Sequence, residues 1–247
     1  MRFGGAMIAI DIHTQPNDET CGPTSLHAVY RYFGVDISLE TVIAGVERSM
    51  SGGTLAALLG VHALTLGFEA TVYVTNLETF DLTWFHHGGV DTVKLTEKLH
   101  QQLRHKHTPG IVQDSAAFLR FLALGGNVRF ETLSIQLLKS FFAENLPVIT
   151  GLSATYLYQC PREVFTDDGQ STYDDIKGTP CGHFVVLCGY DEHHRHIVVA
   201  DPHRENPLSH DNYYKVSSTR LMNAIHLGVL THDANLLVIK PRDSRPE

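Results

Sequence analysis

The sequence predicts an α+β fold in which an N-terminal helical half packs on a C-terminal antiparallel sheet. Helical spacing of apolar residues dominates the first third of the chain, and apolar strand-like runs dominate the second half. Helices followed by a run of strands are typical of α+β proteins rather than of alternating α/β proteins. A length of 247 residues fits one elaborated domain or two small ones.

Apolar spacing and capping residues place the helices. Apolar residues in 21–34 recur at helical spacing, Ser38 can cap a second helix, and a leucine-rich stretch at 55–66 predicts a third. A further helix is expected at 135–142. Residues 78–125 contain helix-like stretches of a different, histidine-rich composition, and we interpret them as a helical insertion or subdomain.

Strands are expected mainly in the second half, where β-branched and aromatic residues gather between turn residues. The expected strands lie at 7–12, 70–74, 128–132, 145–153, 182–191, 196–202, 212–216 and 235–241. Between them, the acidic segment 166–177 is interpreted as a surface loop, with a mobile lid as the alternative. Residues 241–247 are expected to form a frayed tail.

Charge and cysteine content exclude several classes of protein. The net charge of −8 argues against nucleic-acid binding and against docking on an anionic membrane. Four cysteines without a C-x-x-C pair argue against a disulfide scaffold and a structural zinc site. Asp11 interrupts the first apolar run, so no signal peptide is expected, and the uncharged stretch 50–68 has helical periodicity rather than the uniform apolarity of a membrane span. We therefore expect a cytoplasmic protein with reduced thiols.

The segment from Gln15 to Gly22 carries the first chemical signal. Cys21 begins a predicted helix, where the positive end of the helix dipole favours a nucleophilic thiolate. Its backbone N–H can donate to an oxyanion, the Gln15 amide can supply a second donor, and Gly22 would let a substrate carbonyl approach. The competing interpretation of Cys21 is a small buried hydrophobic residue.

The second signal is a predicted hairpin. His183 begins one strand and Asp201 ends the next, so antiparallel pairing would bring the two side chains together. A carboxylate beside an imidazole fixes its tautomer and stabilises its charged form, which makes His183 a candidate base for a thiol. The competing interpretation is a histidine at a strand end and an unrelated capping aspartate.

Other residues offer weaker candidates. Among 16 histidines, the densest cluster is His193, His194 and His196, but adjacent turn residues rarely converge on one ion, so we expect no metal site. Cys181 adjoins Gly182 and His183 and is the rival nucleophile. It precedes a strand rather than a helix, so nothing there would stabilise a thiolate, and Cys21 is preferred.

Taken together, the motifs Q-P-N-D-E-T-C-G, G-H-F-V-V-L-x-G-Y-D and A-D-P resemble papain-like cysteine peptidase family 39, the double-glycine leader peptidases and their stand-alone relatives. The resemblance covers about residues 8–75 and 130–240. It implies a single papain-like domain with Cys21 as nucleophile, His183 as base, Asp201 as orienting acid and Gln15 as oxyanion-hole amide. No Walker A motif or membrane span follows, and the segments 78–125 and 166–177 fall outside the resemblance, which leaves double-glycine specificity open.

The expected function is therefore a cysteine peptidase or amide hydrolase that forms an acyl-enzyme on a peptide or protein substrate, without a cofactor or metal. An acyltransferase or transglutaminase-like enzyme could use the same residues. A non-catalytic peptide-binding module of the same fold is the remaining alternative. We expect neither a nucleic-acid nor a membrane partner, and the oligomeric state is left open.

Overall fold

The computed structural model describes residues 7–49, 52–86, 90–165, 171–231 and 234–242. The helices are α1 (Cys21–Tyr32), α2 (Leu39–Gly45), α3 (Ala56–Thr65), α4 (Thr92–Gln102), α5 (Pro109–Ala123), α6 (Ile135–Ala143), α7 (Ala154–Tyr158) and α8 (Ser218–Leu227), with the 3₁₀ helices η1 (Leu82–Trp84) and η2 (Gly228–Thr231). The strands are β1 (Phe68–Tyr73), β2 (Asn127–Arg129), β3 (Val148–Ser153), β4 (Glu163–Phe165), β5 (Ser171–Tyr173), β6 (Gly182–Asp191), β7 (His196–Ala200), β8 (Tyr213–Ser217) and β9 (Leu236–Pro241).

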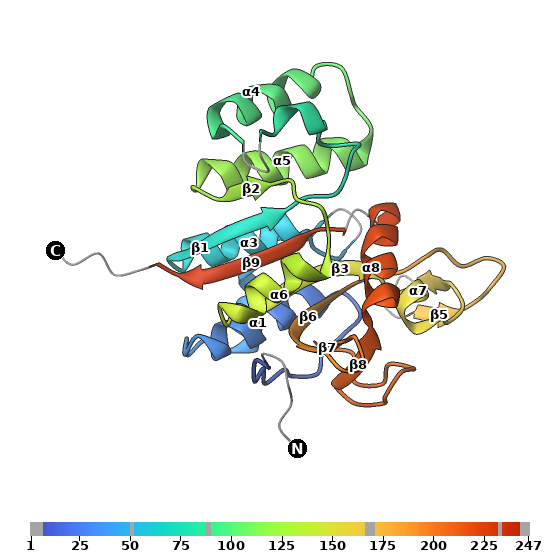
Figure 1. Ribbon diagram of the computed structural model, residues 1–247. Coiled ribbons are helices and arrows are strands. Elements are labelled where there is room, and N and C mark those ends of the chain that lie inside the picture. Colours follow the sequence, from blue (N-terminus) through green and yellow to red (C-terminus); the bar gives the residue numbers. More distant parts are fainter. Residues whose placement is uncertain (1–6, 50–51, 87–89, 166–170, 232–233, 243–247) are drawn as a thin grey trace.

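The described strands form a seven-stranded sheet in the order β2-β1-β9-β3-β6-β7-β8, and β4 and β5 form a separate pair (Figure 1). The predicted α+β architecture is confirmed, since the early helix α1 packs on β6 and α3 packs on β1. Strand pairing is antiparallel, as expected, except between β1 and β2, which are parallel. The helical segment between these two strands provides the crossover that a parallel pair requires.

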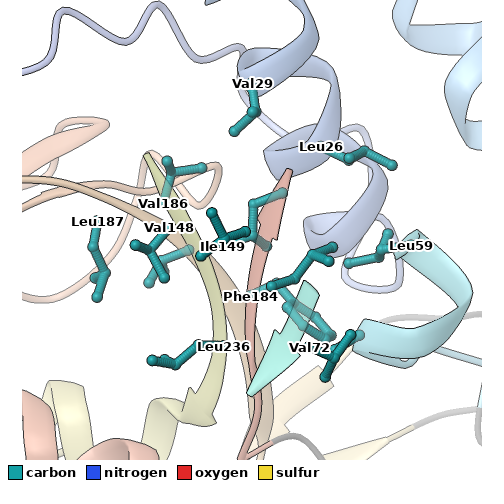
Figure 2. Close-up of a cluster of buried hydrophobic side chains, with 14 of the residues drawn as sticks. Leu26, Val29, Leu59, Val72, Val148, Ile149, Phe184, Val186, Leu187 and Leu236 are labelled. Carbon is teal, nitrogen blue, oxygen red and sulfur yellow. The ribbon is translucent and has the colours of Figure 1, made fainter. Parts of the chain in front are cut away.

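The core lies on both faces of the central strands. Phe184 and Val186 of β6 face Leu26 of α1, while Leu187 and Leu236 lie on the other side of the strands (Figure 2). All five side chains are at most 2% exposed. A strand covered on both faces reads as a continuous apolar run, which explains why β6 was recognisable from its sequence.

The predicted strand at 7–12 does not form. Its ladder pairing with the sheet is limited to a bridge between Met7 and Gly189, with the Ile8 N–H donating to the Cys188 carbonyl at 2.7 Å. The reason is that β3 and β7 already flank β6, and the edge of β6 opens only where its pairing with β3 ends, at Leu187. The hydroxyl of Tyr213 in β8 also bonds the segment, donating to the Ile10 carbonyl and accepting from the Ile12 N–H at 3.1 Å each.

The acidic segment 166–177 is only partly a loop, because Ser171–Tyr173 form β5 and pair with β4. The next residues form a turn in which Asp174 accepts hydrogen bonds from the backbone N–H groups of Ile176 and Lys177. Residues 166–170 lie outside the described part of the chain. The segment therefore extends a hairpin from β4 rather than forming a free surface loop.

Two helices in the second half were not anticipated, α7 and α8. For α8 the signals were present: Ser217 caps it by accepting from the Arg220 N–H, and its buried residues include Leu221 and Ile225, spaced one turn apart. Helix α7 has only five residues and directly follows the fully buried strand β3. A segment this short does not show the repeating apolar spacing by which a helix is predicted from sequence.

The segment 78–125 is helical as expected, through η1, α4 and α5. It is joined to the rest of the fold by the packing of α5 on α3. Its interpretation as an insertion into a single domain stays a prediction. Across the described residues, no helix combines the length and apolarity needed to cross a membrane.

Gly22 has a packing role, and its expected role in substrate approach stays a prediction. A side chain there would overlap the γ-methyl of Thr54, and Leu59 and Phe184 close the same space. The Thr54 hydroxyl donates to the Glu47 carbonyl at 3.1 Å, which holds the methyl in place.

We expect Gly22→Ala to lower the free energy of unfolding by about 1–3 kcal/mol, because the added methyl overpacks this contact. Urea unfolding would measure the loss. Adding Thr54→Ser removes the obstructing methyl and should restore most of the stability. A Gly22→Ala variant as stable as the wild-type protein would contradict this account.

Candidate active site

Cys21 lies at the N-terminus of α1, as the sequence predicted, and its residue is buried at 8% exposure. A turn leads into the helix: the Thr20 hydroxyl donates to the Asn17 carbonyl at 2.9 Å, and the Asn17 side chain accepts from the Glu19 N–H. Thr20 makes no side-chain cap to the helix. No capping side chain of Thr20 therefore occupies the N–H groups of the first turn. These groups remain able to donate hydrogen bonds to an anion at this helix end.

His183 and Asp201 meet as the hairpin predicted. His183 is the second residue of β6, Asp201 directly follows β7, and their Nε2 and Oδ1 atoms are 2.8 Å apart. An ionised carboxylate only accepts hydrogen bonds, so the His183 Nε2 carries the proton. This leaves Nδ1 as the ring nitrogen available to Cys21, whose side chain helps to raise the pKa of His183.

A side-chain contact holds the two elements of this pair together. The Ser25 hydroxyl, one turn after Cys21 in α1, donates to the backbone carbonyl of Phe184, the residue after His183, at 3.2 Å. Ser25 is fully buried. The bond thus fixes the N-terminal turn of α1 against the start of β6.

Two tyrosines that sequence reasoning missed complete the surroundings of Asp201. The hydroxyls of Tyr158 and Tyr214 each donate to Asp201 Oδ2 at 2.7 Å, and the backbone N–H of His203 donates to Oδ1 at 2.8 Å. With His183, four donors therefore hold a carboxylate that is 0% exposed. Such a fully satisfied buried network fixes its members in one arrangement.

The electrostatics of the pair follow from this network. Burial by itself lowers the pKa of His183, but the charge and hydrogen bond of Asp201 and the hydrogen bond with Cys21 raise it above the ordinary value. Burial raises the pKa of Asp201, but His183 and the two tyrosine hydroxyls hold it below the ordinary value. The imidazole is therefore charged, and the carboxylate ionised, at neutral pH.

This pair should make the free energy of unfolding depend on pH. Because the pKa of His183 is higher in the folded protein than in the unfolded protein, its protonation stabilises the fold fully below the unfolded value of about 6.5. This contribution is lost as pH rises through the pKa of the folded protein. Because the pKa of Asp201 is lower in the folded protein, its ionisation stabilises the fold fully above the unfolded value of about 3.9. That contribution is lost as pH falls through the pKa of the folded protein. The advantage of the wild-type protein over His183→Gln should therefore be largest between about pH 4 and 6.5.

Urea unfolding of both proteins from pH 3 to 9 would measure this difference. The exposed His105 offers a matched control, since His105→Gln makes the same exchange outside the buried network. A difference between wild type and His183→Gln that stays constant from pH 5 to 9 would contradict the charged pair.

Gln15 lies beside the corner that carries Asp201. Its backbone N–H donates to the Pro202 carbonyl at 2.9 Å, which joins the turn before α1 to the turn after β7. The Gln15 side-chain oxygen is buried and has no hydrogen-bond partner among the described residues. The amide is thus near the site with unused hydrogen-bonding capacity, and its role as an oxyanion donor stays a prediction.

The rival candidates lie elsewhere. The described residues contain no group of histidines, cysteines and carboxylates arranged to hold a metal ion. In the predicted histidine cluster, His194 instead pairs with Asp191 at 3.0 Å, in an exposed turn. Cys181 lies in the segment before β6, where its N–H donates to the Thr155 hydroxyl at 2.9 Å, so it lacks the helix N-terminus that Cys21 has.

A family model matches the second part of this site. Residues 126–223 match the Peptidase_C39 like family, a segment that contains His183 and Asp201 but not Cys21. This confirms the resemblance to peptidase family 39 over the matched residues. No curated protein matches the chain.

Solved structures give remote similarities over most of the chain. A protein from Bacillus anthracis described as a C39-like peptidase has 15% identity and a TM-score of 0.46, with 96% of this chain and 98% of that chain covered. A double-glycine-motif protease from an AMS/PCAT transporter, solved with the leader peptide, has 15% identity and a TM-score of 0.43, at 96% and 94% coverage. Xylellain, a cysteine protease from Xylella fastidiosa, has 15% identity and a TM-score of 0.43, at 97% and 86% coverage. Similarity this remote assigns neither a substrate nor a residue's role to this chain.

Proposed function

We propose that this protein is a cysteine peptidase or amide hydrolase whose catalytic residues are Cys21, His183, Asp201 and Gln15. The observation that carries the proposal is the buried His183–Asp201 pair at 2.8 Å, together with a cysteine at a helix N-terminus whose side chain helps to raise the pKa of His183. The family match over residues 126–223 supports it independently.

In the proposed reaction, the Cys21 sulfur attacks the carbonyl carbon of a peptide or amide, and the carbonyl electrons move to oxygen. The Cys21 N–H and the Gln15 amide donate to that oxyanion. The charged His183 then gives its proton to the leaving amine as the C–N bond breaks, which leaves a thioester on Cys21. Water, deprotonated by His183, attacks the thioester, the C–S bond breaks, and the acid product leaves the thiolate of Cys21 beside the again charged His183.

Asp201 contributes by holding His183 rather than by touching substrate. Its negative charge stabilises the charged imidazole that must form the pair with the thiolate, and its fixed hydrogen bonds keep the imidazole oriented. The tyrosines Tyr158 and Tyr214 in turn hold the carboxylate, and their hydroxyls stay protonated because burial and the Asp201 charge raise their pKa values.

The rate of alkylation at each cysteine tests this proposal, measured against pH by peptide mass mapping in wild type and His183→Ala. At neutral pH and below, Cys21 should react faster than the other cysteines, and His183→Ala should suppress that reaction. Cys181 is the internal control, because it precedes the strand β6 and does not begin a helix as Cys21 does. If Cys21 reacts no faster than Cys181, or is unaffected by His183→Ala, the proposal fails and a non-catalytic binding module becomes the better interpretation.

A further inference from the structure

A third aromatic ring lies against the proposed catalytic pair. The rings of His183, Tyr158 and His203 form a triangle, with centroids 6.1 Å apart between Tyr158 and each histidine and 6.3 Å between the histidines. His183 and Tyr158 are buried, at 6% and 8% exposure, whereas His203 is only half-buried. His203 is therefore the member of the triangle that faces outward.

The backbone holds His203 in place on both sides. Its N–H donates to Asp201 Oδ1 at 2.8 Å, and its carbonyl accepts from Asn206 Nδ2 at 2.8 Å. Asn206 is fully buried and also donates to the Asp211 carbonyl at 2.8 Å, so it ties the loop after β7 together. A main chain held in this way keeps the side chain of His203 at a defined place beside His183, which lowers the entropy cost of binding a ligand there.

The ring of His203 has hydrogen-bonding capacity to spare. Within the described part of the chain, neither of its nitrogens has a hydrogen-bond partner. Burial and the charge of His183 lower the pKa of His203, partly opposed by Asp201, Asp18 and Glu163, which also face it. At neutral pH the ring therefore offers one donor and one acceptor, the two functions that a peptide group can satisfy.

We propose that His203 is a substrate-binding residue that hydrogen-bonds the peptide backbone of the substrate beside Cys21. The inference rests on the proposed function and adds to it the class of substrate: a chain with peptide groups next to the scissile bond, rather than an isolated amide. His203 acts by binding, so its loss should weaken the affinity for peptides and leave the reactivity of the thiol intact.

The test uses two thiol reagents of different size. Benzyloxycarbonyl-Ala-Ala chloromethyl ketone carries a peptide backbone, and saturation kinetics give its binding constant and its maximal inactivation rate. Methyl methanethiosulfonate carries no peptide group and reports only the reactivity of Cys21. His203→Phe keeps an aromatic ring against His183 and Tyr158 but removes both ring nitrogens, and thermal unfolding checks that the variant is folded.

For His203→Phe we expect the binding constant of the chloromethyl ketone to weaken about 5–10-fold, the effect of one lost hydrogen bond, with the maximal rate changed less than about threefold. The rate with methyl methanethiosulfonate should stay within about threefold of wild type. His203→Asn or His203→Gln should recover part of the affinity, and the exposed His105→Phe should change nothing.

Two results would overturn the inference while leaving the proposed function standing: an unchanged binding constant in His203→Phe, or inactivation of the wild type that shows no saturation with the peptidyl reagent. Failure of the proposed function has a different signature, in which methyl methanethiosulfonate modifies Cys21 no faster than Cys181.

Discussion

Replacement of Cys21 by alanine is expected to lower the rate of peptide hydrolysis by about 10⁴-fold or more, because no acyl-enzyme can form without the thiol. The fold should persist, since the side chain removed is small and most of its neighbours are held by other contacts. Hydrolysis of a peptide mixture, followed by mass spectrometry, would measure the loss, and circular dichroism would check the fold.

Cys181→Ala is the matched control, because it removes a thiol two residues from His183 without removing the proposed nucleophile. It should retain most of the wild-type rate. Turnover that survives Cys21→Ala, or that disappears only in Cys181→Ala, would show that the nucleophile has been assigned to the wrong residue.

The second large effect is expected for Asp201→Ala, which should destabilise the fold by about 3–5 kcal/mol, the usual cost of removing one partner from a buried charge pair. The charged His183 would lose its counterion, and the hydroxyls of Tyr158 and Tyr214 would lose their acceptor in a site closed to water. Denaturant unfolding near pH 6 would measure the change.

Asp201→Asn removes the charge and one of the two acceptor oxygens, because the amide nitrogen that replaces Oδ2 donates and cannot accept from the hydroxyls of Tyr158 and Tyr214. The amide oxygen can still accept from His183, so we expect a smaller loss of stability, about 1–2 kcal/mol. The charge that keeps His183 protonated is gone, however, so hydrolysis at neutral pH should fall at least tenfold. Equal stability of the alanine and asparagine variants would contradict the view that the four donors depend on this carboxylate.

The sequence contained enough to predict the pairing at the centre of the site. Antiparallel strands joined by a tight turn place the start of one beside the end of the next, so His183 and Asp201 could be matched without coordinates. Cys21 could be placed because a helix start is visible in turn residues followed by helical apolar spacing. Each inference needs only the local sequence pattern and one rule about the geometry of strands or helices.

The support around Asp201 could not be predicted in the same way. Alternation in β8 indicates that Tyr214 points inward, but nothing local says which carboxylate its hydroxyl meets. Tyr158 comes from a five-residue helix 43 positions before Asp201, so its partner is set by tertiary packing alone. The strand expected at 7–12 failed for a related reason: its own pattern was adequate, but β6 is paired with β3 and β7 over most of its length and leaves room only for the bridge between Met7 and Gly189.

The order of strands in the sheet has a consequence for synthesis. The last strand in the described chain, β9, lies between β1 and β3 and joins the early part of the sheet to the late part. The hydrogen-bonded cluster that includes Cys21 and Asp201 also takes Tyr214 from β8. A chain emerging from the ribosome therefore exposes its helix α1 long before the partners of Cys21 exist, since distant pairings form only after the intervening residues are made. Cys21 thus gains its neighbours His183 and Asp201 late in translation, so a half-made chain does not contain the assembled candidate site.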